Sequence, residues 1–387
     1  MRIFHLSDLH IGIKLYNRDL RKEQEYLFEQ VIKYVREYQP DVVVIAGDIY
    51  DKTVPSVESV QTFNVFVQGL YEASDKTEIM IVSGNHDSAG RLDYFSWLMS
   101  RQRVHMVGMP PVKPDEYIEK VTLTDEYGEI IFYLLPFSKP SVIRTVFDED
   151  NDRDHDHAYS YNEALHKLFA REKIDTGKRN VLVSHQFYLP SGQRVEDIER
   201  MESEITTVGN IDVVWSDVLE PFEYAALGHI HKPMTVGDDR FRYCGTPFAY
   251  SISEANQEKG ILMADIGRKG EDVHITKLKL EPKRKVAVIE GTFENVLRQA
   301  SDDYVQIRLT DTEDLDVIDL QERLLMAFPN LLEIQRNKTR ELNLSDEILE
   351  HTYNDPFALI CEFIPDMDEE EMEIMKSVMN EALEAEE

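Results

Sequence analysis

Three things are scarce in this sequence: cysteine, basic side chains and long apolar runs. The two cysteines, Cys244 and Cys361, are too few for a disulfide framework and lack zinc-ligand spacing, which is typical of proteins in a reducing cytoplasm. The sequence contains no run of about 18 apolar residues, which is the length that a membrane-spanning helix needs. The opening MRIFHLSDLH does not have the pattern of a secretory signal. We therefore expect a cytoplasmic protein with no membrane association.

Basic side chains are outnumbered by acidic ones. The 387 residues include 42 Lys and Arg against 74 Asp and Glu, a formal net charge of −32. This excludes a general basic surface for gripping nucleic acid, so any phosphate-bearing partner must be held locally. The acidity is uneven, because residues 1–110 carry 12 basic and 15 acidic side chains, whereas residues 341–387 carry 16 acidic ones and a single Lys376.

The acidic tail, residues 341–387, has two interpretations. Charge-rich tails are commonly solvated segments. The alternative is a helix docked on a partner, because most apolar residues near its end fall on one helical stripe. These residues are Met372, Ile374, Met375, Val378, Met379 and Leu383.

The length and the 42% hydrophobic content predict two domains with sizeable cores. From Arg2 to about Gly267, short apolar runs alternate with helical patterns, which predicts an α/β domain with a largely buried sheet. The predicted strands are Ile3–Leu6, Val42–Ala46, Ile79–Val82, Ile130–Leu135, Val181–Ser184, Tyr224–Leu227 and Ile261–Asp265. Helices are predicted around Leu27–Val35 and after Pro55. The acidic segment Asp148–His157 is expected to be a solvated loop, with metal binding as the alternative.

A second, smaller unit is predicted to begin near Lys283–Lys285. Its pattern alternates strands and helices over about 60 residues, so we expect an α+β cap. The expected elements are strand Val286–Ile289, helix Phe293–Gln299, strand Tyr304–Leu309, helix Leu320–Phe328 and strand Leu331–Gln335.

The residues that indicate chemistry come directly after predicted strands, in five short motifs. They are Asp8 and His10 (SDLHIG), Asp48 and Asp51 (AGDIYD), Asn85, His86 and Asp87 (SGNHDS), His185 (VSHQF), and His229 and His231 (LGHIH). Each motif alone is compatible with an ordinary turn or a core histidine. In open α/β sheets, however, the carboxyl ends of strands meet at one crevice, so the five loops are expected to share a site.

The set of side chains favours two metal ions. Seven candidate ligands are too many for one tetrahedral zinc, and no thiolate is among them. Asp48 is the natural bridge, since a carboxylate can use both oxygens between ions about 3.5–4 Å apart. Mixed oxygen and nitrogen donors fit Mn²⁺ or Fe²⁺ better than Ca²⁺ or Mg²⁺, and we expect Mn²⁺.

The motif order D-x-H, GD-x-x-D, GNHD, H and GH-x-H resembles the calcineurin-like metallophosphoesterase superfamily over residues 8–231. The resemblance implies a sandwich of two packed mixed sheets flanked by helices. It implies one metal held by Asp8, His10, Asp48 and His231, and a second held by Asp48, Asn85, His185 and His229. It makes His86 the catalytic histidine, with the Asp51 carboxylate as its partner. The alternative for Asp51 is a turn carboxylate flanking a helix, and Asp87 is as well explained by a helix start.

Longer phrases resemble the SbcD family of DNA double-strand-break nucleases over nearly the whole chain. They are FHLSDLHIGIKL, GDIYDK, GNHDSAGRL, GHIHKP and YCGTPFAYSISEANQEKG. The resemblance implies a nuclease domain over residues 1–280, a DNA-contacting capping domain over 283–340, and a helical tail over 341–387 that binds an SbcC-type ATPase. It implies ATP-dependent exonuclease action on double-stranded DNA ends and endonuclease action on hairpins or single strands, in DNA repair, recombination and replication.

The family also implies a homodimer within a heterotetramer of two nuclease and two ATPase subunits. The candidate dimer segments are Val57–Tyr71 and Tyr94–Met99, although amphipathic helices usually face their own core. Basic side chains near the motifs are few, so we expect weak intrinsic DNA affinity. They are Lys14, Arg18, Arg21, Lys22, Arg91, Arg101 and Arg103, with Arg194, Lys232 and Lys283–Lys285 elsewhere. The alternatives are a phosphoesterase for nucleotides or phosphoproteins, and a mainly architectural subunit of an ATPase complex.

Overall fold

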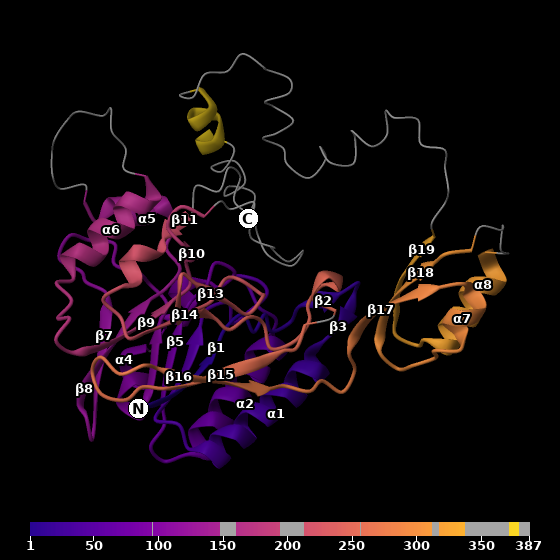
Figure 1. Ribbon diagram of the computed structural model, residues 1–387, viewed down its shortest axis with the longest axis horizontal. Coiled ribbons are helices and arrows are strands. Elements are labelled where there is room, and N and C mark those ends of the chain that lie inside the picture. The colour runs from indigo at the N-terminus through magenta and orange to yellow at the C-terminus, as the bar shows by residue number, and fades with distance from the viewer. Residues whose placement is uncertain are drawn as a thin grey trace.

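The computed structural model describes residues 1–94, 96–147, 160–193, 213–255, 257–311, 317–336 and 371–378. Within these ranges, a large unit of two sheets with flanking helices is followed by a smaller unit (Figure 1). The segment Asp148–His157, which we expected to be a solvated loop, and the basic residue Arg194 lie outside the described ranges, as does most of the tail.

The first sheet has six strands and is mixed. From edge to edge they are β16 (His274–Lys279), β15 (Gly260–Asp265), β1 (Arg2–Leu6), β4 (Val42–Ala46), β5 (Glu78–Val82) and β6 (Val104–Val107). Strands β1, β4, β5 and β6 run parallel to one another, while β15 pairs antiparallel with β1. The middle of this sheet therefore joins the start of the chain to residues some 260 positions later.

The second sheet also has six strands. In spatial order they are β13 (Met234–Val236), β14 (Asp238–Tyr243), β12 (Tyr224–Leu227), β9 (Arg179–Ser184), β8 (Gly128–Leu135) and β7 (Glu119–Asp125). Strands β14, β12, β9 and β8 are parallel, and β13 and β7 pair antiparallel with their neighbours.

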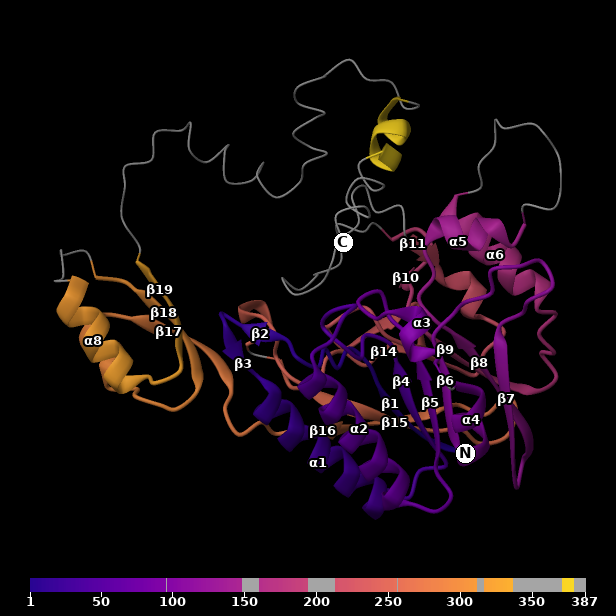
Figure 2. The same ribbon diagram turned by 180° about the vertical axis from the view of Figure 1, so that it is seen from behind.

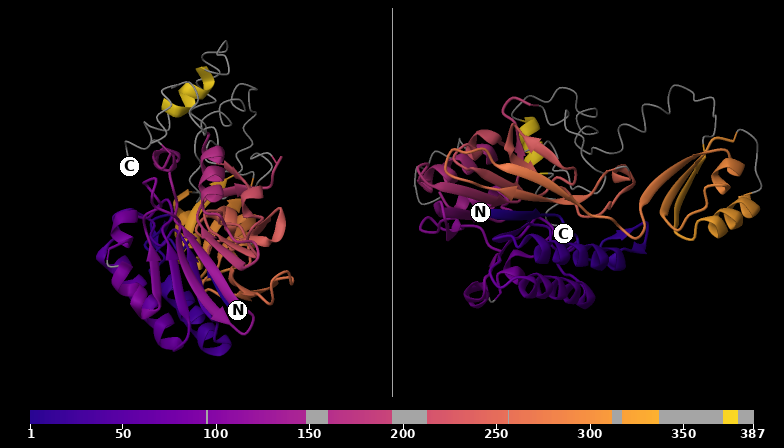
Figure 3. Two further views of the ribbon diagram at one scale, coloured as in Figure 1. Left: turned by 90° about the vertical axis from the view of Figure 1, so that its left-hand side faces the viewer. Right: turned by 60° about the horizontal axis from the view of Figure 1, so that its bottom comes forward.

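The two sheets pack face to face, and helices cover their outer faces (Figure 3). Helices α1 (Arg21–Tyr38) and α2 (Val57–Ala73) lie on the first sheet, and α5 (Pro140–Thr145) and α6 (Tyr161–Arg171) lie on the second. Strand β4 is buried on both faces: Val43 and Ile45 pack toward the helices, while Val42 and Val44 pack into the core between the sheets. The expected sandwich of two packed mixed sheets is confirmed.

The smaller unit is a parallel three-stranded sheet with two helices. Its elements are β17 (Val286–Gly291), α7 (Phe293–Leu297), β18 (Tyr304–Leu309), α8 (Val317–Ala327) and β19 (Leu331–Arg336). It has its own core, which includes Val305, Leu324 and Phe328. The α+β architecture expected for this segment is what the structure contains.

A short hairpin connects the two units (Figure 2). Strands β2 (Lys14–Leu15) and β3 (Arg18–Asp19) follow the first motif. Tyr16 donates from its hydroxyl to Glu333 (3.2 Å), and Arg18 donates to the carbonyl oxygens of Pro329 and Leu331 (3.3 and 3.4 Å). Beside the hairpin, Arg284 pairs with the buried Glu23 at 3.0 Å.

All seven strands predicted in the large unit are present, but five strands of its two sheets were not predicted. These are β6, β7, β13, β14 and β16. Four of the five lie at sheet edges. Of these, β7 (EKVTLTD) and β16 (HITKLK) carry exposed polar residues, and β6 and β13 are only four and three residues long. A continuous apolar run indicates a strand that is covered on both faces. Strands at the edge of a sheet are less covered, so they lack this signal.

Residues 371–378 form a helix in which Ile374 and Val378 are exposed, whereas Met379 and Leu383 lie outside the described residues. None of the helices in the described ranges has the length and apolar character needed to span a bilayer. Cys244 is buried with a free thiol.

Candidate metal centre

The motif loops gather because the strands that precede them run parallel. Strands β1, β4 and β5 end side by side in the first sheet, and β9 and β12 end side by side in the second. The loops are bonded to one another, since Asp8 N donates to Gly47 O and His10 N donates to Asp48 O, both at 3.0 Å. The two sheets meet at this edge, where His185 Nδ1 donates to Ala46 O at 2.7 Å.

Several motif residues adopt a backbone conformation that L-residues rarely use. Asp8, His10, Asp48 and His229 have φ angles of 53°, 43°, 50° and 98°. Such conformations cost on the order of 1–3 kcal/mol each and persist where surrounding contacts enforce them, typically at functional sites. The strain therefore coincides with the residues that the sequence singled out.

Two glycines allow the loops to approach. A Cβ on Gly84 would collide with the Asp48 carboxylate and main chain, and one on Gly228 would collide with the carbonyl oxygen of Ala46. Both contacts involve fixed groups, so a side chain at either position would push two motif loops apart.

Asp48 lies at the centre of the cluster and is buried. Its Oδ2 is 3.3 Å from His185 Nε2, 3.5 Å from His10 Nε2 and 3.9 Å from His86 Nε2. His231 Nε2 completes one side, at 3.1 Å from His10 Nε2 and 3.9 Å from Asp8 Oδ1. Among the described residues, three overlapping groups have donor atoms within 4.8 Å of one another: Asp8, His10 and His231; His10, Asp48 and His86; Asp8, Asp48 and His185.

Asn85 holds the other side of the cluster. Its Oδ1 lies 3.1 Å from His185 Nε2 and 3.0 Å from His229 Nδ1. The main-chain N–H of His229 donates to Asp8 Oδ1 at 3.0 Å, which links this side to the first motif. All seven candidate ligands are thus in one cluster.

The donor set fits a divalent cation. The Nδ1 proton of His185 is used on Ala46. Burial lowers the pKa of His185, but the Asp48 carboxylate outweighs it and raises that pKa to about 9, so Nε2 carries a proton toward Asp48, and a divalent cation would take the place of that proton. Burial lowers the pKa of His231 to about 3 and that of His10 well below its usual value, so both rings are neutral. Lone pairs that converge in a dry site repel one another unless a cation lies among them.

Burial and neighbouring charges also shift the pKa values of the two acidic candidate ligands, Asp8 and Asp48. Burial raises the pKa of Asp8 to about 7, with the nearby Asp48 carboxylate acting in the same direction. Burial also opposes ionisation of Asp48, but His185 and His86 outweigh it and hold its pKa well below the usual range. Asp48 is therefore the permanent negative charge of the site. A divalent cation would favour ionisation of Asp8 as well.

His86 lies beside the cluster and is partly open to solvent. Its main-chain N–H donates to Asp48 Oδ1 at 2.9 Å, and its Nδ1 bonds the main-chain oxygen of Asp51 at 3.0 Å. The structure thus puts the carbonyl of Asp51, not its carboxylate, on the ring. Burial lowers the pKa of His86, but the Asp48 carboxylate and the Asp51 carbonyl outweigh it, so the net shift is upward.

Asp87 uses its carboxylate in hydrogen bonds to the main chain. Its carboxylate accepts hydrogen bonds from the main-chain N–H groups of Ile49, Tyr50 and Gly84, at 3.0, 2.9 and 2.9 Å. It therefore ties the GDIYD loop to the GNHD loop.

The arrangement is suited to hydrolysis of a phosphate ester. A divalent cation in the cluster would supply positive charge that neutralises a phosphoryl group and activates water for attack. His86, with Nδ1 held on a carbonyl and Nε2 free to carry a proton, is positioned to donate to a leaving oxygen.

Two residues that hold the first motif were not predicted. The Gln24 side-chain N–H group lies 2.9 and 3.0 Å from the carbonyl oxygens of Leu9 and His10, and the Tyr250 hydroxyl donates to Leu9 O. A single glutamine on the buried face of α1 was the available sequence signal, and on its own it is not specific.

Comparison with known proteins agrees with this geometry. The model of the calcineurin-like phosphoesterase family matches residues 1–250, and the chain belongs to this family. A second model, described as type 5 capsule protein repressor C-terminal domain and labelled SbcD_C, matches residues 282–367. The SbcD component of the nuclease SbcCD from Staphylococcus epidermidis is 28% identical over 361 residues, 92% of this chain and 87% of that relative. Within the family, the chain is therefore an SbcD-type metallophosphoesterase.

Solved structures give weaker likenesses. A dimetal phosphatase from Danio rerio has a TM-score of 0.41 and 14% identity, covering 72% of this chain and 96% of that one. GAP50, described as the anchor in the inner membrane complex of Plasmodium, has a TM-score of 0.36 and 13% identity, covering 89% and 98%. Neither likeness supports an inference about function.

Proposed function

We propose that this protein is the nuclease subunit of an SbcCD-type complex and hydrolyses phosphodiester bonds of DNA. The single observation that carries the proposal is the cluster of seven candidate ligand side chains, Asp48 among them at its centre, with His86 beside it. Its relative of similar length is named as a nuclease subunit, which supports DNA as the substrate.

The proposed site holds two divalent ions, most suitably Mn²⁺. Asp8, His10, Asp48 and His231 form one ligand set. Asp48, Asn85, His185 and His229 form the other. The mixture of carboxylate, amide and imidazole donors supports this choice of metal. His86 is the proposed proton donor, and the proposed part of Asp51 is to hold the His86 ring through its main-chain oxygen.

A cavity lined by Asp51, the residue that bonds the His86 ring, is the proposed contact for a DNA phosphate. It has a volume of about 500 Å³, and its charged lining consists of three basic side chains, Lys14, Arg21 and Lys52, and three acidic ones, Asp19, Asp51 and Glu58. Counterion release from a few such contacts gives modest, salt-sensitive affinity. We propose exonuclease action on double-stranded ends and endonuclease action on hairpins or single strands, in repair, recombination and replication.

The proposed division of labour follows the chain. Residues 1–280 form the nuclease domain, 283–340 the capping domain that contacts DNA, and 341–387 the acidic tail that binds an SbcC-type ATPase. The match to residues 282–367 supports a unit shared with SbcD proteins. A cytoplasmic location fits the two cysteines and belongs to the same proposal.

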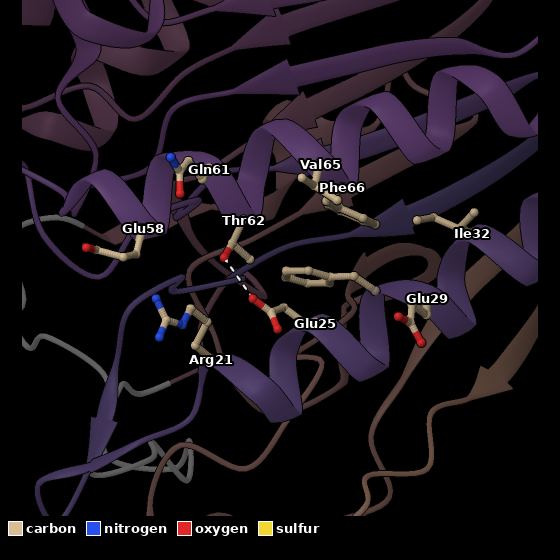
Figure 4. A pocket seen from close by; sticks show the side chains of 10 residues that line it. Arg21, Glu25, Glu29, Ile32, Glu58, Gln61, Thr62, Val65 and Phe66 are labelled. Atoms are coloured by element: carbon tan, nitrogen blue, oxygen red, sulfur yellow. Dashed lines mark hydrogen bonds between the residues drawn. The ribbon is translucent and has the colours of Figure 1, made fainter.

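A homodimer is proposed through α2 and the segment 94–99. Val57, Val60 and Val65 are 69%, 45% and 65% exposed along α2, and Trp97 is 63% exposed. Val65 also lines a groove between α1 and α2, in which Thr62 bonds Glu25 (Figure 4). That groove contains none of the candidate ligands, so this face is separate from the metal centre.

The deciding experiment incubates the purified protein with end-labelled duplex and hairpin DNA, with Mn²⁺ or Mg²⁺, and with or without the ATPase partner and ATP. We expect Mn²⁺-dependent cleavage of the hairpin, and duplex cleavage that increases with the partner and ATP. Ready hydrolysis of nucleotides with duplex and hairpin left intact in every condition would instead establish a nucleotide phosphoesterase.

A further inference from the structure

The phrase TPFAYSISEANQEKG contains no candidate metal ligand, yet the structure places it directly behind the ligand loops. Thr246 N donates to the carbonyl oxygen of His231 at 3.2 Å, and Tyr250 donates to Leu9 next to His10. Neither contact involves a candidate ligand side chain. Any influence of the segment on metal binding would therefore pass through the residues of the ligand loops.

At its centre lies a buried ion pair. Glu254 Oε2 is 2.6 Å from Lys259 Nζ, and the two side chains are 0% and 6% exposed. Thr246 donates from its hydroxyl to Glu254 Oε2 at 2.8 Å, and Ser251 donates to Oε1 at 3.0 Å. Removing two charges from water costs several kcal/mol per ion, so a buried pair is a poor device for stability alone.

The pair faces His231 from the side opposite the ligand cluster. Glu254 Oε1 lies 4.0 Å from Nδ1 of His231, while Nε2 of the same ring faces His10 and Asp8. Lys259 Nζ donates to the main-chain oxygen of His231 at 3.3 Å. One partner thus acts on the ring and the other on the backbone of the same residue.

We propose that Glu254, held in place by Lys259, is a positioning residue for His231. Its negative charge favours the tautomer with the proton on Nδ1, which leaves the Nε2 lone pair directed at the metal. Carboxylates behind metal-binding histidines act in this way. The inference rests on the proposed role of His231 as a metal ligand, and it assigns the ion pair to metal binding instead of general stability.

The test is Mn²⁺ binding to the full chain, followed by electron paramagnetic resonance and calorimetry. Glu254→Gln keeps the shape of the side chain and removes its charge. We expect one of two Mn²⁺ sites to weaken about 10–100-fold, the usual effect of losing such a partner, while the other changes little. The matched control is Glu258→Gln, because Glu258 lies in the same segment with a 71% exposed side chain.

A double variant separates positioning from stability. Glu254→Gln alone leaves Lys259 buried without its partner and can lower the melting temperature. Glu254→Gln with Lys259→Met removes both charges at similar volume. The proposal expects the melting temperature to recover in the double variant while Mn²⁺ affinity stays low. Recovery of both would mean that the pair serves only stability and would overturn it.

The result is independent of cleavage. A wild-type protein that binds fewer than two Mn²⁺ ions contradicts the proposed metal centre itself. A wild-type protein that binds two, beside a folded Glu254→Gln variant that binds both with unchanged affinity, contradicts only the role of Glu254. Co²⁺ substitution gives a second readout, since the proposal expects the visible absorption bands of Co²⁺ to shift in Glu254→Gln and not in Glu258→Gln.

Discussion

At the scale of single residues, the histidines proposed to hold metal differ in burial from the one proposed to move a proton. His10, His185 and His231 are buried, and their Nε2 atoms point into the cluster. His86 is the histidine beside them with a side chain 16% exposed, and its Nδ1 is fixed by the main-chain oxygen of Asp51. A ring that is fixed on one nitrogen and open at the other is suited to proton transfer.

His86→Asn should therefore keep both metals and lose cleavage by about 10²–10⁴-fold, the usual contribution of a general acid. Asp51→Asn retains the main-chain oxygen, so its loss should be at least tenfold smaller. Metal content and hairpin cleavage are measured on the same samples. The control is His105→Asn, since His105 pairs with Glu78 on the neighbouring strands β6 and β5. Full cleavage by His86→Asn would remove His86 from the mechanism.

His5 gives a prediction for stability against pH. It lies between the sheets, with Nδ1 2.9 Å from the Tyr224 hydroxyl and Nε2 3.2 Å from Leu227 O, and burial lowers its pKa to about 3. The unfolded chain binds a proton at about pH 6.5, which the folded chain does not, so stability falls as pH drops from about 6.5 toward 3. The loss is about 2 kcal/mol between pH 7.5 and 5.0.

Urea unfolding at several pH values checks this, with His5→Gln as the comparison. Glutamine can bond the same two oxygens and does not titrate, so the variant should lose less stability between pH 7.5 and 5.0 than the wild type. Equal losses in the two proteins would show that His5 is not the group responsible.

At the scale of elements, the hairpin β2–β3 is the mechanical link between the metal centre and the cap. It begins four residues after His10 and contacts the cap through Tyr16 and Arg18. A displacement of the cap would therefore pull on the hairpin and, through it, on the loop that carries Asp8 and His10. The cap also packs on the large unit through Val286 and Tyr304, which belong to that unit's hydrophobic core, so the polar contacts of the hairpin, each worth roughly 0.5–1.5 kcal/mol, are only part of the joint.

Arg18→Ala should loosen the cap without disturbing the ligands. We expect cleavage of duplex DNA to fall several-fold while hydrolysis of a small phosphodiester such as bis-p-nitrophenyl phosphate stays within twofold. Faster proteolysis near residues 280–285 would report the loosened joint. Arg36→Ala, at the exposed end of α1, is the control. Equal losses on both substrates would mean that Arg18 acts on the centre itself.

The sequence predicted the elements and residues whose signals are local. Central strands such as β4 are apolar on both faces, and the ligand motifs have fixed spacing, so both could be found without coordinates. Edge strands such as β7 carry no continuous apolar run. Gln24 and Tyr250 could not be identified because their partners lie far away in the chain, as with the 226 positions between them. Glu254 lies only five positions from Lys259, but nothing in the local sequence shows that this pair is buried behind His231.

At the scale of the whole molecule, charge and exposed apolar surface are placed on different parts. The formal charge of −32 is concentrated toward the end of the chain, while the exposed apolar residues of α2 belong to the nearly neutral first 110 residues. Apolar surface that is low in charge favours contact with a second copy, and strong acidity disfavours it.

Val60→Glu combined with Val65→Glu should therefore convert a dimer to a monomer, because two charges would be buried in the contact. Sedimentation velocity at micromolar concentration measures the mass, and Mn²⁺ binding should be unchanged. The control is Val54→Glu, an equally exposed valine outside the helix. A wild-type protein that sediments as a monomer would contradict the proposed interface.

The pairing of β1 with β15 also bears on when the proposed metal centre can form during synthesis of the chain. His10 and His231 are 221 positions apart, and the sheet that supports the first ligand loop lacks its β15 neighbour until residue 265 has been made. At about 5–20 residues per second, translation separates the two ligands by roughly 10–40 s. A nascent chain therefore holds an incomplete ligand set until His231 has been made, and a product truncated before that residue could not form the proposed metal centre.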